Sequence, residues 1–365
     1  QASARAYALG QRVDDLSQVA RSLVMMADGP LGRGQLSQLT AIGEQLQALA
    51  QHPRVTASAP LAAQLALYVD YVWGSLYYAR GDLLVAREHL TRVASTLNTP
   101  PDTLVETHLR VISQVWLIYT LWLLGYPDQA LTRSQRTLAA VHNLDYAIPL
   151  HFALIIGEVG VRHLRGESRA MQTALAQLTT LKAEAGLGLF QPWVMLFEGW
   201  LMAVVQHDPD GLRLMQQAIQ IWEKEAGSRG GMLTQYNLLI EGYLALGQAD
   251  AALADLDTML DFIDTTDLRV AEAEFLRLRG EALRMLDAPE EAAACFQRAR
   301  TVARKQNAKA WELRAALSLC RLYQAPGQTT KLAAARAQLA EVYGWFTEGF
   351  DTADLQEAAA LLAET

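Results

Sequence analysis

The chain has 365 residues, of which 51% are hydrophobic and 19% are charged, and it carries a net charge of −8 at pH 7. Ala and Leu are prominent and β-branched runs are scarce, a composition that favours packed helices over sheets. The acidic balance provides no general surface for phosphate groups, so we do not expect nucleic acid as the main ligand.

The first predicted element is a degenerate N-terminal helical hairpin over residues 1–54. Its loop, "GPLGRGQLS", spaces Gly29 and Gly34 as in a phosphate-binding loop, but Gln35 stands where that motif requires Lys. We therefore predict an ordinary connection between helices here. The chain begins at Gln1 with neither Met nor a signal-peptide pattern, which suggests a segment of a longer protein, although processing would also explain it.

Residues 55–343 are predicted to form about seven helix pairs with a period of about 40 residues. Each pair reads as an apolar helix, a short turn and a second helix that starts near an acidic residue. A small residue at the turn supplies the left-handed conformation that ends the first helix. These turn residues are Gly81, Gly125, Gly166, His207, Gly247, Asp287 and Gly327, at spacings of 44, 41, 41, 40, 40 and 40.

The pattern inside these pairs resembles the tetratricopeptide family, in which small residues early in each helix allow close packing. The matching residues are Gly74, Tyr77, Ala86 and Leu90 in one unit and Gly280, Ala292, Phe296 and Ala299 in another. The period exceeds the family's usual value, so we describe the pairs as tetratricopeptide-like. The resemblance implies an all-α fold, a single domain over residues 1–365 built as a right-handed superhelical solenoid of helical hairpins.

In the tetratricopeptide family the first helix of each pair lines a concave groove. By register, the groove residues of this chain are Tyr68, Tyr71, Tyr78, Tyr119, Trp122, His163, Phe197, Asn237, Glu241, Glu274, Arg277, Glu281 and Arg284. One end of the groove is then aromatic and the other charged, which suits a protein, a peptide or a small effector. The alternative, that these side chains only pack or pair along helix faces, stays open.

Catalytic, cofactor and metal motifs are not recognisable in the sequence. The histidines form no HExxH pattern and no close pair with cysteine, so no metal site is predicted. Cys295 and Cys320 lie in apolar helical patterns and are expected to be buried thiols in a reducing cytoplasm. We expect no catalysis, no cofactor and no membrane-spanning helix in this segment.

The ending "YGWFTEGFDTADLQEA" is more specific than the rest of the chain. We predict that residues 344–365 form a C-terminal cap with a short final helix. In this prediction a glycine reverses the chain, aromatic residues cover the apolar end of the last repeat, and Asp351 or Thr352 caps the helix. The predicted cap residues are Gly344, Trp345, Phe346, Phe350 and Asp351.

The segments "AKAWELRAALSLCRLY" and "AEVYGWFTEGFDTADLQEAAALLAE" resemble the carboxy-terminal region of bacterial STAND-type signalling ATPases, many of them adenylate or guanylate cyclase fusion proteins. The layout is similar to that of maltose-activator-type regulators. This resemblance implies a non-catalytic, cytoplasmic sensor domain that binds a protein, peptide or small effector and controls an upstream NTPase or output domain. The alternative is a structural scaffold that self-associates without a soluble effector.

Overall fold

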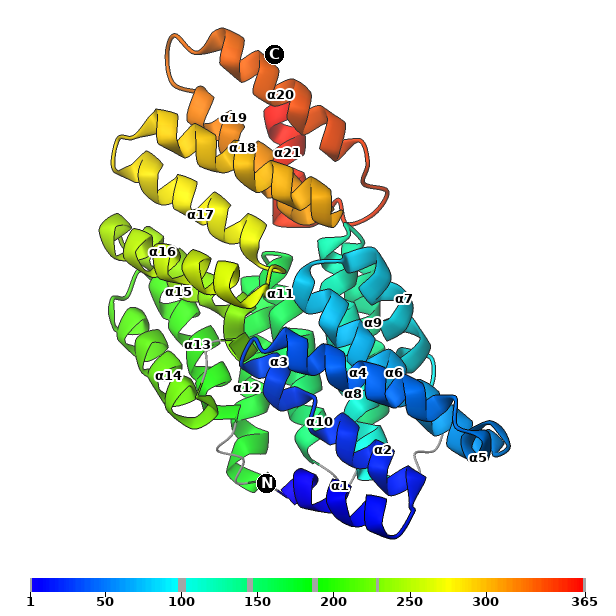
Figure 1. Ribbon diagram of the computed structural model, residues 1–365. Helices are drawn as coiled ribbons and strands as arrows, with labels where there is room; N and C mark the ends of the chain where they lie inside the picture. The colour runs from blue at the N-terminus through cyan, green and yellow to red at the C-terminus, as the bar shows by residue number, and fades with distance from the viewer. Residues whose placement is uncertain (1, 98–102, 143–146, 186–189, 228–229, 364–365) are drawn as a thin grey trace.

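The computed structural model describes residues 2–97, 103–142, 147–185, 190–227 and 230–363, and within these ranges the chain is all-α with no strand (Figure 1). The predicted all-α class is thereby confirmed. The helices are α1 (Ala2–Arg12), α2 (Leu16–Met25), α3 (Asp28–Gly32), α4 (Leu36–Ala50), α5 (Pro53–Thr56), α6 (Ala59–Arg80), α7 (Leu83–Ala94), α8 (Leu104–Leu123), α9 (Pro127–Val141), α10 (Ala147–Phe152), η1 (Ala153–Val159), α11 (Gly160–Leu164), α12 (Ser168–Ala185), α13 (Gln191–Trp200), η3 (Leu201–Val205), α14 (Asp210–Ala226), η4 (Gly230–Gln235), α15 (Tyr236–Ala245), α16 (Ala249–Thr266), α17 (Glu272–Met285), α18 (Pro289–Gln306), α19 (Lys309–Tyr323), α20 (Thr329–Tyr343) and α21 (Ala353–Ala363).

Helices that follow one another in the chain pack against one another. The helix α8 packs on both α7 and α9, α18 packs on both α17 and α19, and α21 covers α19 and α20. Figure 1 shows these neighbours as successive antiparallel hairpins. Sequential pairing of helices, as expected from the sequence, is therefore confirmed. None of the helices in the described ranges is long and apolar enough to cross a membrane.

The turns between these helices follow the predicted chemistry. The predicted turn residues from Gly81 to Gly327 all adopt a positive φ, from 55° at His207 to 91° at Gly125. In this left-handed conformation the chain satisfies the last carbonyl groups of the first helix and leaves its axis. Asp287 adopts it with φ 58°, so the two turn positions without glycine behave like the others. The turn positions are thus fixed by local sequence.

The first half of the chain also lies against the second half. The N–H of Val270 donates to the carbonyl oxygen of Ala79 at 3.1 Å, which joins residues 191 positions apart (270 − 79). Farther towards the N-terminus, a Cβ on Gly34 would lie 2.7 Å from the side chain of Thr266 at the end of α16. These contacts bring the loop after α3 and the end of α6 next to the end of α16 and the loop that follows it.

Both cysteines are buried and free, as expected from their apolar surroundings in the sequence. Burial raises the pKa of the Cys320 thiol to about 11. A thiol with a raised pKa is a poor nucleophile at neutral pH, so Cys320 is a core side chain rather than a reactive group.

Candidate functional site

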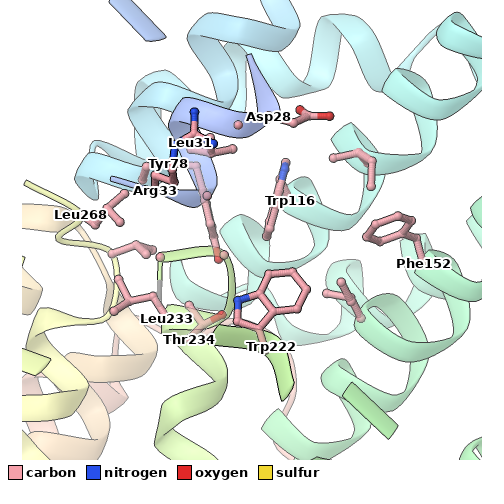
Figure 2. Close-up of a pocket in the computed structure, with 18 of the residues that line it drawn as sticks. Asp28, Leu31, Arg33, Tyr78, Trp116, Phe152, Trp222, Leu233, Thr234 and Leu268 are labelled. Carbon is pink, nitrogen blue, oxygen red and sulfur yellow. The ribbon is translucent and has the colours of Figure 1, made fainter. Parts of the chain in front are cut away.

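An apolar pocket of about 400 Å³ lies where distant parts of the chain meet (Figure 2). Its walls come from α3, from α6 and α8, from the end of α10 and η1, and from α13, α14, η4 and the loop before α17. We call this space the aromatic pocket. Its aromatic rings belong to Tyr71, Tyr78, Trp116, Phe152, Trp193 and Trp222.

Helical spacing explains how two of the helices line the aromatic pocket. On α6, Tyr71 and Tyr78 are seven positions apart, and on α8, His108, Ile112 and Trp116 follow at intervals of four. Residues at these intervals lie on one face of an α-helix. The rings of Tyr78 and Trp116 stack with their centroids 5.0 Å apart, which joins the two faces.

The opposite wall depends on close contacts between backbone segments. A Cβ on Gly230 would lie 2.6 Å from the carbonyl oxygen of Gly32, so a side chain at that position would push α3 and η4 apart. A Cβ on Gly231 would likewise lie 2.6 Å from the ring of Trp222. The width of the aromatic pocket is therefore set by glycines that let two distant segments touch.

Several buried donors at the aromatic pocket have no hydrogen-bond partner within the described residues. They are the hydroxyl of Tyr78 and the indole N–H groups of Trp116 and Trp222. Figure 2 shows the three side chains around the same space. A buried donor without an acceptor costs about 1–3 kcal/mol, so an acceptor atom on a bound molecule would be stabilised here.

One edge of the aromatic pocket is polar. The hydroxyl of Tyr71 donates to Asp28 Oδ1 at 2.6 Å, and His108 Nε2 lies 3.7 Å from Asp28 Oδ2. Burial, with a smaller contribution from the Asp28 carboxylate, raises the pKa of Tyr71 well above its ordinary value. Tyr71 is therefore a neutral donor that orients Asp28 at the edge.

The structure places the predicted aromatic groove residues at different sites. Tyr71 and Tyr78 line the aromatic pocket, whereas Tyr68 is fully buried and does not. Sequence reasoning did not single out Trp116, although it lies one helical turn before the predicted Tyr119 on the same helix. The sequence also did not indicate that α3 and η4 line the aromatic pocket, because contacts between distant segments bring these two elements to it.

Five other predicted groove residues meet around a much smaller cavity of about 20 Å³. They come from α8, α11, α13 and α15, and they are Tyr119, His163, Phe197, Asn237 and Glu241. A cavity of this size has room for about one water molecule. The register predicted that these side chains line a concave groove, and in the structure they surround this small cavity; their role in binding stays a prediction.

His163 and Glu241 share this buried environment. Burial lowers the pKa of His163 to about 3, so its imidazole is neutral at pH 7, and burial raises the pKa of Glu241. The indole N–H of Trp200 donates to Glu241 Oε2 at 2.6 Å, and His163 Nε2 lies 3.7 Å from the same oxygen. The pair is thus held by neighbouring rings and a single charge-assisted hydrogen bond.

The predicted charged end of the groove lies on α17. Arg277 donates to both oxygens of Glu274, at 2.7 and 2.8 Å, and Arg284 donates to Glu281 at 2.9 Å. Burial alone would raise the pKa of Glu274, but the guanidinium groups of Arg277 and Arg314 outweigh it and lower that pKa. Only Arg284 of this predicted set is exposed. The charges are therefore mostly satisfied within the protein.

Trp122, the remaining predicted groove residue, is also buried. Arg314 lies over its ring at 5.0 Å from the centroid, and the ring of Trp311 meets it edge-on at 4.8 Å. Arg314 in turn donates to Asp354 at 2.7 Å in the first turn of α21. Trp122 thus belongs to the contact between α8 and the C-terminal helices.

The C-terminal residues 344–353 lie against the start of α9, and we call them the C-terminal clasp. Glu348 Oε1 accepts from the backbone N–H groups of Asp128 and Gln129, both at 3.0 Å, across 220 and 219 positions of sequence. Asp128 Oδ2 in return accepts from the N–H of Gly349 at 2.9 Å. The first turn of α9 is therefore capped by a carboxylate from the far end of the chain.

Arg165 holds the other end of the C-terminal clasp. Its side chain is 1% exposed and donates to both carboxylate oxygens of Asp351 at 2.8 Å and to Asp128 at 2.9 Å. Its carbonyl oxygen accepts from the N–H of Ala353 at 3.2 Å. A buried guanidinium that binds several carboxylates fixes the distance and the orientation between the segments that carry them, so the position at which α21 starts is defined.

The predicted aromatic cap residues have different surroundings. Phe346 is 7% exposed and packs in the core beneath α21, whereas Trp345 is 37% exposed and lies against Tyr126 with ring centroids 5.3 Å apart. Phe350 is 49% exposed and meets the ring of Tyr343 at 5.9 Å. Only Phe346 enters the core under the last helix.

One detail of the predicted ending is wrong. Gly344 adopts a right-handed φ of −63°, and the residue with left-handed φ of 76° is Gly349. Glycine suits position 349 because it adopts the left-handed conformation readily and because the ring of Pro127 leaves no room for a Cβ there. Asp351 binds Arg165 through two charge-assisted hydrogen bonds, and Thr352, the alternative predicted cap, is the residue directly before α21.

Within the described ranges, no group of three or more His, Cys, Asp or Glu side chains is arranged to hold a metal ion. A scan against models of known protein families finds no match, and a search of curated proteins finds no relative. The helical hairpins and the aromatic pocket are therefore the features from which a function has to be inferred.

Proposed function

We propose that this chain is a non-catalytic sensor domain of a larger bacterial signalling ATPase and that its effector binds in the aromatic pocket. In this proposal the helix pairs form a right-handed superhelical, tetratricopeptide-like solenoid with a period of about 40 residues. The left-handed turns from Gly81 to Gly327 support a regular repeat. The contacts between residues 191 positions apart support an array that curves back onto itself.

The observation that carries the proposal is the set of unpaired donors around an apolar space. A volume of about 400 Å³ lies within the range of about 300–1,000 Å³ typical of small-molecule sites. Folded proteins rarely leave buried donors unpaired, because each costs free energy that an apolar replacement would avoid. These features favour a small effector over the peptide or protein that the sequence also allowed.

The chemistry of the pocket walls limits the kinds of effector that can bind. Trp116 and Trp222 can only donate through their indole groups, so the effector must present acceptor atoms such as carbonyl or ether oxygens. The surrounding rings favour a flat, largely apolar body. The carboxylate of Asp28 and the guanidinium of Arg33 both line the aromatic pocket, so its charged groups have opposite signs and favour no net charge on the effector. A neutral, planar molecule with carbonyl acceptors fits these conditions.

Such an effector would act by changing the relative stability of two arrangements of the chain. It would contact α3, α8 and η4 at once, and the backbones of α3 and η4 come close together at Gly32 and Gly230. A molecule that binds the closed arrangement more tightly shifts the population towards it. An attached NTPase that senses this closure would then respond to the effector.

The test uses an uncharged fluorescent probe, N-phenyl-1-naphthylamine, and flavone as a flat apolar competitor with acceptor oxygens. We expect the probe to bind and flavone to displace it. The Tyr78→Phe/Trp116→Phe variant keeps an aromatic ring at both positions but loses two donors, so flavone should bind about tenfold more weakly and should lose more affinity than the probe does. Tyr68→Phe, a buried tyrosine of the same helix outside the aromatic pocket, is the control.

The proposal fails if the probe does not bind to the wild-type chain. It also fails if flavone binds equally well to the wild-type chain and to the variant that lacks the two donors. Loss of flavone binding in Tyr68→Phe as well would attribute the effect to a general change in the core.

A second candidate function is self-association, favoured by the exposure of Trp345 and Phe350 in the C-terminal clasp. Two exposed aromatic side chains in one segment provide apolar surface that a second copy of the chain could cover. Light scattering over a range of concentrations distinguishes the two candidates. A mass that rises with concentration and falls back in Trp345→Ser/Phe350→Ser supports self-association, and a constant monomer mass refutes it.

A further inference from the structure

A second groove, more polar than the aromatic pocket, lies between α7 and α9 and has a volume of about 1190 Å³. Both helices pack on α8, which forms its floor with the apolar side chains of Leu117 and Leu121. Figure 1 shows α7 and α9 beside each other at the edge of the molecule. We call this space the α7–α9 groove.

Two arginines lie at one end of the α7–α9 groove. Arg133 and Arg136 are three positions apart on α9, so they share a helix face, and Arg87 lines the groove from α7. Arg133 donates from Nη1 to the side-chain oxygen of Gln114 at 2.8 Å, and Gln114 is itself fixed by a 2.7 Å bond to the carbonyl of Ala94. The guanidinium of Arg133 is therefore held in place by a neutral partner.

In the described part of the chain, neither Arg133 nor Arg136 forms an ion pair with a carboxylate. The carboxylates that line the α7–α9 groove already have other partners. Asp128 accepts from Arg165 and Gly349, and Glu348 accepts from the first turn of α9. Burial and the neighbouring charge of Arg136 lower the pKa of Arg133. The arginine end of the groove thus keeps an uncompensated positive charge in a chain of net charge −8.

We propose that Arg133 and Arg136 bind the phosphate group of a small phosphomonoester whose ester group lies in the α7–α9 groove. A phosphate dianion matches two adjacent guanidinium groups in charge and geometry better than a single carboxylate does. The site is separate from the aromatic pocket, so it does not depend on the function proposed above.

The test measures the affinity of phenyl phosphate, inorganic phosphate and acetate at low ionic strength by titration calorimetry. We expect phenyl phosphate to bind most tightly, because its phenyl group also contacts the walls of the groove, and acetate to bind most weakly. Arg133→Gln/Arg136→Gln should weaken phenyl phosphate about tenfold or more. Arg213→Gln/Arg298→Gln removes the same charge from two exposed arginines on α14 and α18 and should leave binding unchanged.

Arg136→Gln alone keeps the buried contact of Arg133 with Gln114 and should already weaken binding without affecting folding, since Arg136 is exposed. The proposal is overturned if no phosphate compound binds, or if the control pair on α14 and α18 weakens binding as much as the α9 pair. Equal affinities for phenyl phosphate and inorganic phosphate would refute the ester assignment, and equal affinities for acetate and phosphate would refute the dianion site.

Discussion

Replacing Gly349 with Ala should weaken the C-terminal clasp strongly, whereas replacing Gly344 should not. At Gly349 the backbone φ is 76°, and a Cβ would lie 2.0 Å from Cγ of Pro127. At Gly344, φ is −63° and the nearest atom to a Cβ is the carbonyl oxygen of Ala340, at 3.3 Å. The two glycines lie five positions apart in the same segment, so each is a control for the other.

The expected cost follows from two effects at Gly349. An alanine in the left-handed conformation costs about 1–2 kcal/mol, and forcing a methyl group into a filled space costs about 1–3 kcal/mol. Together they give about 2–5 kcal/mol for Gly349→Ala. Gly344→Ala should instead stabilise the protein by about 0.4–1 kcal/mol, because the native conformation suits alanine and the unfolded chain loses entropy.

The assay has two parts, because the C-terminal clasp can open without global unfolding. Urea unfolding gives the global free energy, and hydrogen exchange of the amides of Asp128, Gln129, Gly349 and Ala353 reports local opening. Gly349→Ala should speed exchange at these amides even if the urea midpoint changes little. The reasoning is refuted if Gly344→Ala costs as much as Gly349→Ala, or if Gly349→Ala changes neither the urea midpoint nor the exchange rates.

Three further predictions concern buried polar groups. Without ligand, Tyr78→Phe should leave the free energy of unfolding unchanged or raise it by about 1 kcal/mol, because the hydroxyl of Tyr78 has no partner among the described residues. Tyr71→Phe should lower the free energy of unfolding by about 1.5–3 kcal/mol, because it removes the hydrogen bond to Asp28. The reverse order in urea unfolding would contradict this. His163 stays neutral when folded but takes up a proton when unfolded below its ordinary pKa of 6.5, so stability should fall as pH drops below that value. His163 should account for a loss of about 2 kcal/mol in the free energy of unfolding between pH 7 and pH 5, and His163→Phe should remove this loss. An unchanged pH dependence of stability in that variant would contradict the role given to His163. Glu274→Gln should lower the free energy of unfolding by about 3–5 kcal/mol, because Arg277 and Arg314 are both buried and both lose the charge of this carboxylate. A loss below 1 kcal/mol would refute this.

The sequence by itself determined the class of fold and the positions of the helix turns. Alanine- and leucine-rich runs form helices whatever their neighbours, and the conformation at Gly81 or Gly247 depends on a few adjacent residues. These are local properties with a period set by the helix itself.

Only the tertiary structure decided what those inward faces meet. The aromatic pocket needs α3 and η4. From the sequence, the residues of α3 were predicted to be an ordinary connection between helices, and those of η4 were not singled out. The C-terminal clasp needs Pro127 opposite Gly349, 222 positions away (349 − 127). Such contacts depend on the summed angles of many consecutive helix pairs, and a small change at each pair would bring different side chains together. The helices can therefore be predicted from the sequence, whereas the spaces between distant helices cannot.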